Sequence, residues 1–110
     1  MKGPEARIEE IGNKYAKSRG CSVHKGKSPA QRGVPDRMYS HINCGPFLVE
    51  YKAPGEKSTA QQIEVQDDMA RCGWRIYRDV DGVGMAKQII DDEINGVPTN
   101  QRQYKPLSPL

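Results

Sequence analysis

The segment formed by residues 47–52, Phe-Leu-Val-Glu-Tyr-Lys, constrains the fold of this chain more than any other. Its first half is continuously apolar, which is typical of a strand inside a sheet, and its second half alternates between charged and other residues. Because side chains alternate between the faces of a strand, Glu50 and Lys52 share one face and Val49 and Tyr51 share the other. The segment therefore predicts a central strand that carries two charges on one face at its end.

The flanking patterns predict the element order αβββαβα. Strands are expected at residues 21–24, 34–41, 46–53 and 74–80, with the second and third joined by a hairpin turn at 42–45. Helices are expected over residues 5–19, from a cap at Ser58 or Thr59 to about residue 72, and from a cap at Asp79 or Asp81 to residues 95–96. This order predicts an α/β fold, with a mixed central sheet flanked by helices.

Length and composition bound the class of protein. A chain of 110 residues is the size of one domain, which we place at residues 1–96, with residues 97–110 as a proline-containing tail or an arm exchanged between subunits. No apolar run is long enough to cross a bilayer, and no apolar N-terminal segment predicts secretion. The three cysteines lack the spacing of a zinc site, so we expect a reduced, cytoplasmic protein.

Charge is segregated along the chain, although the net charge is only +3. The stretch from residue 14 to residue 37 is rich in lysine and arginine and contains a single acid, Asp36, whereas acids dominate residues 50–93. This pattern fits a protein that meets a polyanion over part of its surface. A basic surface that is merely solvated explains the same charges and remains the alternative.

Asp36 is the third charged residue of a possible site. It follows Gly33 and Pro35, which bend the chain, and pairing of the hairpin strands brings it beside Glu50. Two carboxylates with Lys52 at one end of a sheet suit Mg²⁺ or Mn²⁺, and a lysine beside the metal can orient an attacking water. The alternative for Glu50 and Lys52 is a simple ion pair on one strand face.

These residues resemble a known nuclease pattern. Asp36 followed by Glu50-x-Lys52 has the layout of the PD-(D/E)xK superfamily, and Pro35 completes its first two letters. The surroundings are similar to those of a stand-alone, phage-type VRR-NUC (virus-type replication-repair nuclease) domain over residues 5–90. The matching features are Glu9 in the first helix, residues 32–36, residues 49–53, Gln62 and Gly73. Tyr51 departs from the Phe or Leu that is more usual there.

The resemblance implies a restriction-endonuclease-like core and a set of site residues. It implies catalysis by Asp36, Glu50, Lys52 and Gln62, and a metal held by Glu9, Asp36, Glu50 and the Tyr51 backbone carbonyl. Helical phase places Glu9 at the border of the buried face and Glu10 in solvent, while Glu5 lies in a first turn that can fray. Either Gln61 or Gln62 is expected to cap its helix, which leaves the other for the site.

The predicted activity is that of a structure-selective DNA endonuclease, dependent on Mg²⁺ or Mn²⁺ and needing no small-molecule cofactor. The resemblance implies a homodimer that acts on branched DNA such as four-way junctions, in the cytoplasm of a bacterial host if the gene is a phage gene. The residues expected to contact DNA phosphates are basic: Lys25, Lys27, Arg32, Arg37 and Lys57. The alternatives are a non-catalytic nucleic-acid-binding module and a nuclease acting on flap DNA or RNA.

Overall fold

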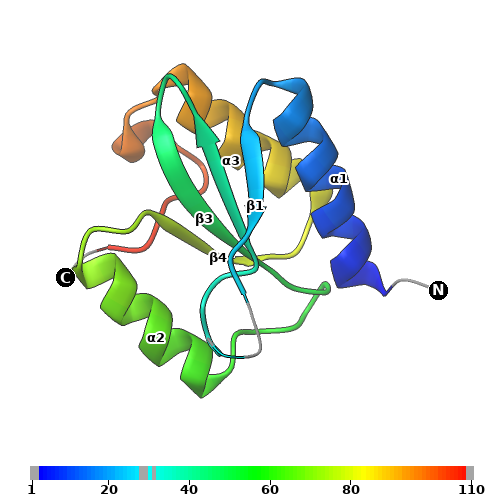
Figure 1. Cartoon of the computed structure of the whole chain (residues 1–110), viewed down its shortest axis with the longest axis vertical. Helices are drawn as coiled ribbons and strands as arrows, with labels where there is room; N and C mark the ends of the chain where they lie inside the picture. Colours follow the sequence, from blue (N-terminus) through cyan, green and yellow to red (C-terminus); the bar gives the residue numbers. More distant parts are fainter. Residues whose placement is uncertain (1–2, 28–29, 31, 109–110) are drawn as a thin grey trace.

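A computed structural model describes residues 3–27, 30 and 32–108 of the chain. Its elements agree with the predicted order. They are α1 (Pro4–Ser18), β1 (Ser22–Lys25), β2 (Arg37–His41), β3 (Gly45–Tyr51), α2 (Ala60–Arg71), β4 (Ile76–Val80), α3 (Val83–Asn95) and the short 3-10 helix η1 (Thr99–Gln101) (Figure 1). None of the helices in the described residues is long and apolar enough to cross a membrane.

The four strands form one mixed sheet in the order β1-β2-β3-β4. β1 with β2 and β2 with β3 are antiparallel, whereas β3 and β4 are parallel, because α2 carries the chain across the sheet between them. Arg37 pairs with Val49, so the residue before Arg37 lies opposite the residue after Val49. These two residues are Asp36 and Glu50, and the structure has the hairpin register that the sequence predicts.

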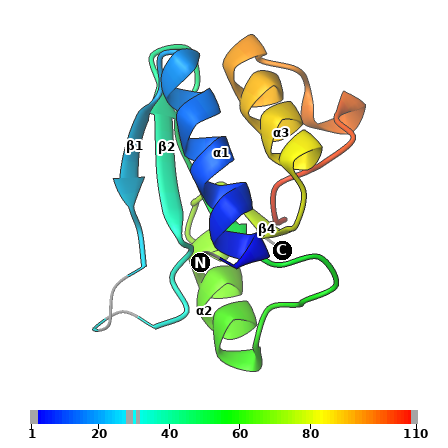
Figure 2. The ribbon, with the colours of Figure 1, turned by 90° about the vertical axis from the view of Figure 1, so that its right-hand side faces the viewer.

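The two faces of the sheet are covered by different helices. α1 and α3 lie side by side on one face (Figure 2), where Phe47, Val49 and Tyr51 of β3 join a core with both helices. On the other face, Leu48 packs with Ala70 of α2 and with Ile76. Since side chains alternate along β3, Glu50 lies on the same face as Leu48 and therefore beneath α2.

Tyr51 fixes the position of α1 on its face of the sheet. The Tyr51 hydroxyl lies 2.7 Å from the hydroxyl of Tyr39, which donates a hydrogen bond of 2.6 Å to Asn13 Oδ1 on α1. A Cβ atom at Gly12 would overlap the Tyr51 hydroxyl, so only glycine allows this close approach. The position of α1 along its own axis, relative to the sheet, is therefore fixed. This position decides which of its acids reaches the end of β3.

The predicted cap of the third helix is wrong. α3 begins after Gly82, which makes no side-chain cap hydrogen bond. Asp79 instead accepts hydrogen bonds from the backbone N–H (2.9 Å) and hydroxyl (2.7 Å) of Ser58. Asp79 also has a φ of 58°, a left-handed conformation that aspartate tolerates better than most residues. The aspartate is used to hold the loop before α2 against the end of β4.

The segment after α3 folds back on the same chain. Arg102 donates to Glu93 Oε2 (2.6 Å) and to the Val97 carbonyl (2.6 Å), and the Leu107 N–H donates to the Ile76 carbonyl (2.8 Å). These contacts cover the outer side of β4. The division at residue 96 and an exchange of this segment between subunits stay predictions, and residues 109–110 lie outside the described part.

Candidate active site

Three carboxylates from separate elements meet at the end of β3, and we call them the carboxylate cluster. Glu5 of α1, Asp36 before β2 and Glu50 of β3 each offer an oxygen, and these oxygens lie within 4.8 Å of one another. Oxygens bound to one Mg²⁺ at about 2.1 Å are separated by no more than about 4.2 Å. The three oxygens therefore lie only slightly farther apart than ligands of one ion can, so modest side-chain movements would let them hold a divalent cation, and such hard oxygen donors suit Mg²⁺ or Mn²⁺.

Asp36 is held in the cluster by backbone contacts. Its Oδ2 accepts a hydrogen bond of 2.9 Å from the N–H of Tyr51, on the neighbouring strand. Its own carbonyl accepts a hydrogen bond of 2.9 Å from the N–H of Gly26, and a Cβ atom at Gly26 would overlap the Pro35 carbonyl. The turn that carries Asp36 is thus clamped between β3 and the chain leaving β1.

Glu50 is fully buried and receives hydrogen bonds on both carboxylate oxygens. Gln66 Nε2 donates to Oε1 (3.1 Å), and Gln62 Nε2 makes a longer contact with Oε2 (3.4 Å). Burial, followed by the negative charge of Asp36, raises the pKa of Glu50 to about 8. Burial and Asp36 also raise the pKa of Glu5. The cluster is short of positive charge, which is the electrostatic state expected of a cation site.

Lys52 and Gln62 form the side of the site that faces α2. The Lys52 ammonium donates to Gln62 Oε1 (2.9 Å) and lies 3.7 Å from Glu50 Oε2. Gln62 Oε1 also accepts from the N–H of Thr59, while the Thr59 hydroxyl accepts from the N–H of Gln62. Gln62 therefore caps α2 and orients Lys52 at once, so the two roles that the sequence assigned to separate glutamines fall on one residue.

The structure brings a different acid of α1 into the carboxylate cluster from the one that the sequence predicts. Glu9 is not a member of the cluster and forms an ion pair with Arg37 of β2, so a direct or water-mediated contact of Glu9 with a metal stays a prediction. Glu5 lies one turn nearer the start of α1, on the same helix face, and reaches Asp36 and Glu50 instead. Pro4, the first helical residue, has the backbone φ that a helix needs and makes a well-formed start to the turn that carries Glu5.

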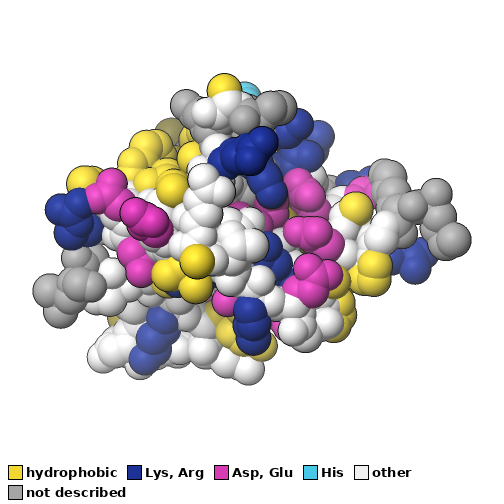
Figure 3. All heavy atoms as spheres, turned by 90° about the horizontal axis from the view of Figure 1, so that it is seen from below, with side chains coloured by type: hydrophobic (Ala, Val, Ile, Leu, Met, Phe, Trp, Pro, Cys, Tyr) yellow, Lys and Arg dark blue, Asp and Glu magenta, His cyan; other side chains and the backbone are white. Residues whose placement is uncertain are grey.

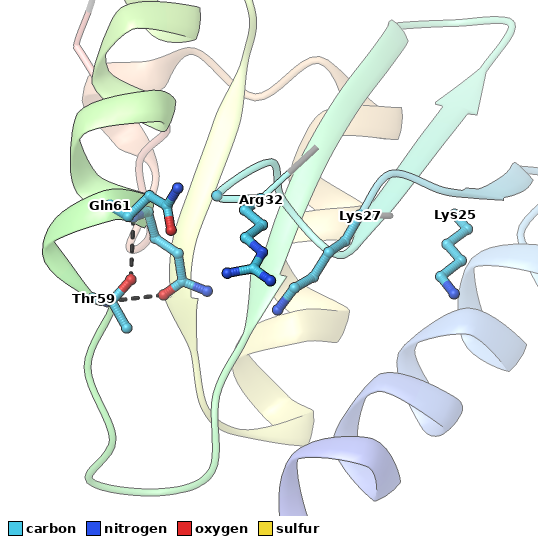
Figure 4. Close-up of a pocket in the computed structure, with 7 residues that line it drawn as sticks. Lys25, Lys27, Arg32, Thr59 and Gln61 are labelled. Carbon is cyan, nitrogen blue, oxygen red and sulfur yellow. Dashed lines mark hydrogen bonds between the residues drawn. The ribbon is translucent and has the colours of Figure 1, made fainter. Parts of the chain in front are cut away.

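A basic hollow adjoins the carboxylate cluster, and we call it the basic groove. It has a volume of about 470 Å³, and Figure 4 shows Lys27 and Arg32 between α2 and Lys25. Its lining residues are Lys25, Lys27, Arg32, Gly33, Thr59, Gln61 and Gln62. Gln62 belongs to both the groove and the site, and Lys27 lies near enough to oppose the upward pKa shifts of Glu5 and Glu50.

The five predicted DNA-contacting residues are not all in this groove. Lys25, Lys27 and Arg32 line it, whereas Arg37 is turned toward Glu9 and Lys57 is exposed in the loop before α2. Figure 3 shows this end of the molecule, where acidic side chains gather with lysine and arginine side chains around them. Contacts of Arg37 and Lys57 with DNA stay predictions, as does the ligand role of the Tyr51 carbonyl.

Gln66 is the polar residue that the sequence analysis missed. It is fully buried and lies one helical turn after Gln62 on α2, so both amides face β3. The buried stripe of α2 is Gln62, Gln66 and Ala70, while Ile63 is 40% exposed. The available signal was two glutamines four residues apart, a spacing that puts them on one helix face.

Comparison with known proteins bears on the fold of the chain and on one segment of its sequence. No protein-family model matches the chain. A 44-residue segment, 40% of the chain, is 48% identical to a protein described as "Putative nuclease p44" from Acyrthosiphon pisum secondary endosymbiont phage 1. The match spans 47% of that protein, so the chain covers about half the length of this relative.

A solved structure described as a VRR_NUC domain matches with a TM-score of 0.71. The match covers 82% of this chain and 97% of that chain, at 18% sequence identity. The mixed sheet with its flanking helices is therefore a restriction-endonuclease-like α/β fold, as predicted. Within that class, the chain has the fold of a VRR-NUC domain.

Proposed function

We propose that this protein is a divalent-metal-dependent endonuclease that hydrolyses phosphodiester bonds in DNA. The observation that carries the proposal is the carboxylate cluster beside Lys52, at the end of the central strand. The VRR-NUC fold and the similarity to a phage protein described as a nuclease support it. We further propose a cytoplasmic site of action.

Glu5, Asp36 and Glu50 are the proposed metal ligands, with the Tyr51 carbonyl as a fourth. When bound there, Mg²⁺ or Mn²⁺ would supply a Lewis acid for the scissile phosphate and lower the pKa of a water molecule. The protein's own part is to hold three oxygens from three elements in one place. Burial of Glu50 and its contacts with two amides keep that carboxylate from turning toward solvent.

Lys52 is the proposed partner of the attacking water. The residue is only 7% exposed, and its ammonium group has three hydrogens, of which one is directed at Gln62 Oε1 (2.9 Å). The remaining hydrogens can orient a water and bind a phosphate oxygen. Gln62 has the proposed role of fixing the direction of the ammonium, because its carbonyl oxygen is itself held by the Thr59 N–H.

The basic groove is the proposed binding site for the DNA backbone next to the cleaved bond. Its lysines and arginine present point charges to phosphates, and no described element has the form of a base-reading helix-turn-helix or zinc finger. We therefore propose selection by DNA shape, on branched DNA such as four-way junctions. A homodimer would supply the two sites that two cut strands need.

Labelled four-way, flap, single-stranded and linear duplex DNA, together with RNA, provide the test. We expect cleavage with Mg²⁺ or Mn²⁺, strongest on four-way DNA, and none in EDTA or with Lys52→Ala protein. Faster cleavage of flap DNA or RNA would change the proposed substrate and leave the proposed metal-dependent hydrolysis standing. Binding without cleavage of any substrate, in either metal, would favour the non-catalytic binding module and reject the proposal.

A further inference from the structure

Gln66 is a buried amide that has three hydrogen-bond partners and uses both hydrogens of its NH₂ group. Its Nε2 donates to Glu50 Oε1 (3.1 Å) and to the Gly33 carbonyl (3.1 Å), and its Oε1 accepts from Arg78 Nε (3.1 Å). Arginine can only donate, so the oxygen of the amide must face Arg78 and the NH₂ group must face Glu50 and Gly33. The direction of the amide is thus determined by its three partners.

Arg78 is itself held in place on the surface of α2. Its guanidinium forms an ion pair with Asp67 and donates to the Ile63 carbonyl (3.3 Å). A chain of contacts therefore runs from Arg78 on β4, through Gln66 on α2, to Glu50 on β3. This chain holds one carboxylate oxygen of Glu50 from the side opposite the sheet.

The second hydrogen of the amide ties Glu50 to the basic groove. Gly33 lines the groove beside Arg32, has a φ of 89°, and packs so closely against α2 that a Cβ atom would lie 2.8 Å from Val65 Cγ2. Because one NH₂ group bridges the Gly33 carbonyl and Glu50, a shift of the Gly33 turn is transmitted to the carboxylate. Gln66 is thus a second link between the two parts of the proposed site, beside Gln62.

We propose that Gln66 is a positioning residue, which orients Glu50 for metal binding and couples it to the turn that lines the basic groove. This inference rests on the proposed function. Residues that hold a metal ligand from behind alter metal affinity by about 10- to 100-fold when they are replaced. The side chain of Gln66 reaches the groove only through the Gly33 carbonyl and is hydrogen-bonded directly to Glu50, so its loss should act chiefly through metal occupancy.

Calorimetric titration with Mn²⁺, followed by cleavage over a range of Mn²⁺ concentrations, tests the proposal. Gln66→Met keeps the length of the side chain and removes its hydrogen bonds. We expect the Mn²⁺ dissociation constant to rise by about 10- to 100-fold. The half-saturating Mn²⁺ concentration for cleavage should rise in parallel, while the rate at saturating Mn²⁺ should return to near the wild-type value. A merely structural residue would not produce this separation.

Two further variants keep the test decisive. Met69→Ala removes packing from the same helix without touching Glu50, and it should lower stability while leaving the Mn²⁺ affinity unchanged. Arg78→Met leaves Gln66 in place but frees its amide, and should weaken Mn²⁺ binding in the same direction by a smaller factor. This variant replaces Gln66→Met as the test if the latter does not fold.

Unchanged Mn²⁺ affinity in the folded variants would overturn the role of Gln66 and leave the proposed function standing. A rate loss that saturating Mn²⁺ does not restore would also overturn it, because Gln66 would then act on a step other than metal binding. If the wild-type protein neither binds Mn²⁺ nor cleaves DNA, the proposed function fails and the role of Gln66 fails with it.

Discussion

Removing one charge from the carboxylate cluster should make the metal-free protein more stable while it abolishes cleavage. Asp36→Asn is the sharpest change, because an asparagine oxygen can still accept the Tyr51 N–H and its NH₂ group can donate toward Glu50. The variant therefore exchanges a repulsive contact for a hydrogen bond without changing the shape of the residue. The physical basis of this expectation is that the carboxylates of the cluster repel one another in the metal-free protein and that a bound metal would relieve this repulsion.

The size of the effect follows from the geometry. Two full charges at 4.8 Å or less, in an effective dielectric constant of about 20, repel by about 3.5 kcal/mol or more. Protonation of Glu50, whose pKa is raised to about 8, relieves most of this repulsion at neutral pH. We expect Asp36→Asn to add about 1–2 kcal/mol at pH 9, equivalent to about 4–8 °C in Tm, and much less at pH 6.

Urea unfolding in EDTA at pH 6 and pH 9, followed by circular dichroism, measures this difference. Asp68→Asn is the matched control, because it removes an exposed carboxylate paired only with Arg71 on the surface of α2. The control should change stability little at either pH. A variant Asp36→Asn that is no more stable than the wild type at pH 9 would refute the argument that the cluster is electrostatically strained.

Three other outcomes are expected. Gly12→Ala should destabilise the protein by about 1–3 kcal/mol in thermal unfolding, because the new methyl group overlaps the Tyr51 hydroxyl; unchanged Tm would show that α1 does not meet the sheet as described. The metal-free wild type should lose stability from pH 5 to pH 9, because Glu50 binds its proton more tightly folded than unfolded; stability rising over that range would contradict the raised pKa. Reversing the charges of the groove residues Lys25, Lys27 and Arg32 in Asp36→Asn protein should weaken binding to all duplex sequences alike. The slope of log affinity against log salt concentration should fall by about 0.9 for each phosphate that the variant no longer neutralises, and an unchanged slope would mean that these charges are merely solvated.

The relative positions that the sequence predicted and the structure confirms are those governed by a local repeat. Glu50 and Lys52 share a face because strands alternate, and Asp36 comes opposite Glu50 because a short hairpin sets the register. Both relations hold over a few residues and do not depend on how helices pack. The same locality explains why the order of helices and strands could be predicted.

The helix acid could not be chosen in this way. Glu5 and Glu9 lie on the same helix face, and the difference between them is a rise of about 6 Å along the axis. Periodicity gives the angle around a helix but not its height against the sheet, which the contact of Gly12 with Tyr51 sets. Arg37, whose charge neutralises Glu9, reaches it only across the folded structure.

Gln66 was missed for a related reason. Hydrophobic periodicity assigns glutamines to the solvent face of a helix, yet on α2 the face toward β3 is the polar one. A buried carboxylate needs amide donors above it, so the helix that covers Glu50 buries Gln62 and Gln66 and leaves Ile63 exposed at 40%. The inverted pattern of α2 is thus a consequence of the site.

The assignment of Glu5, Asp36 and Glu50 as the metal ligands is tested most directly by calorimetric titration of Mn²⁺ into two variants beside the wild type. Glu5→Gln and Glu9→Gln each remove one acid from the same face of α1. We predict that Glu5→Gln weakens Mn²⁺ binding at least tenfold, whereas Glu9→Gln, which loses only the ion pair with Arg37, binds Mn²⁺ as the wild type does. The opposite pattern, or a wild-type protein that does not bind Mn²⁺, would contradict the assignment.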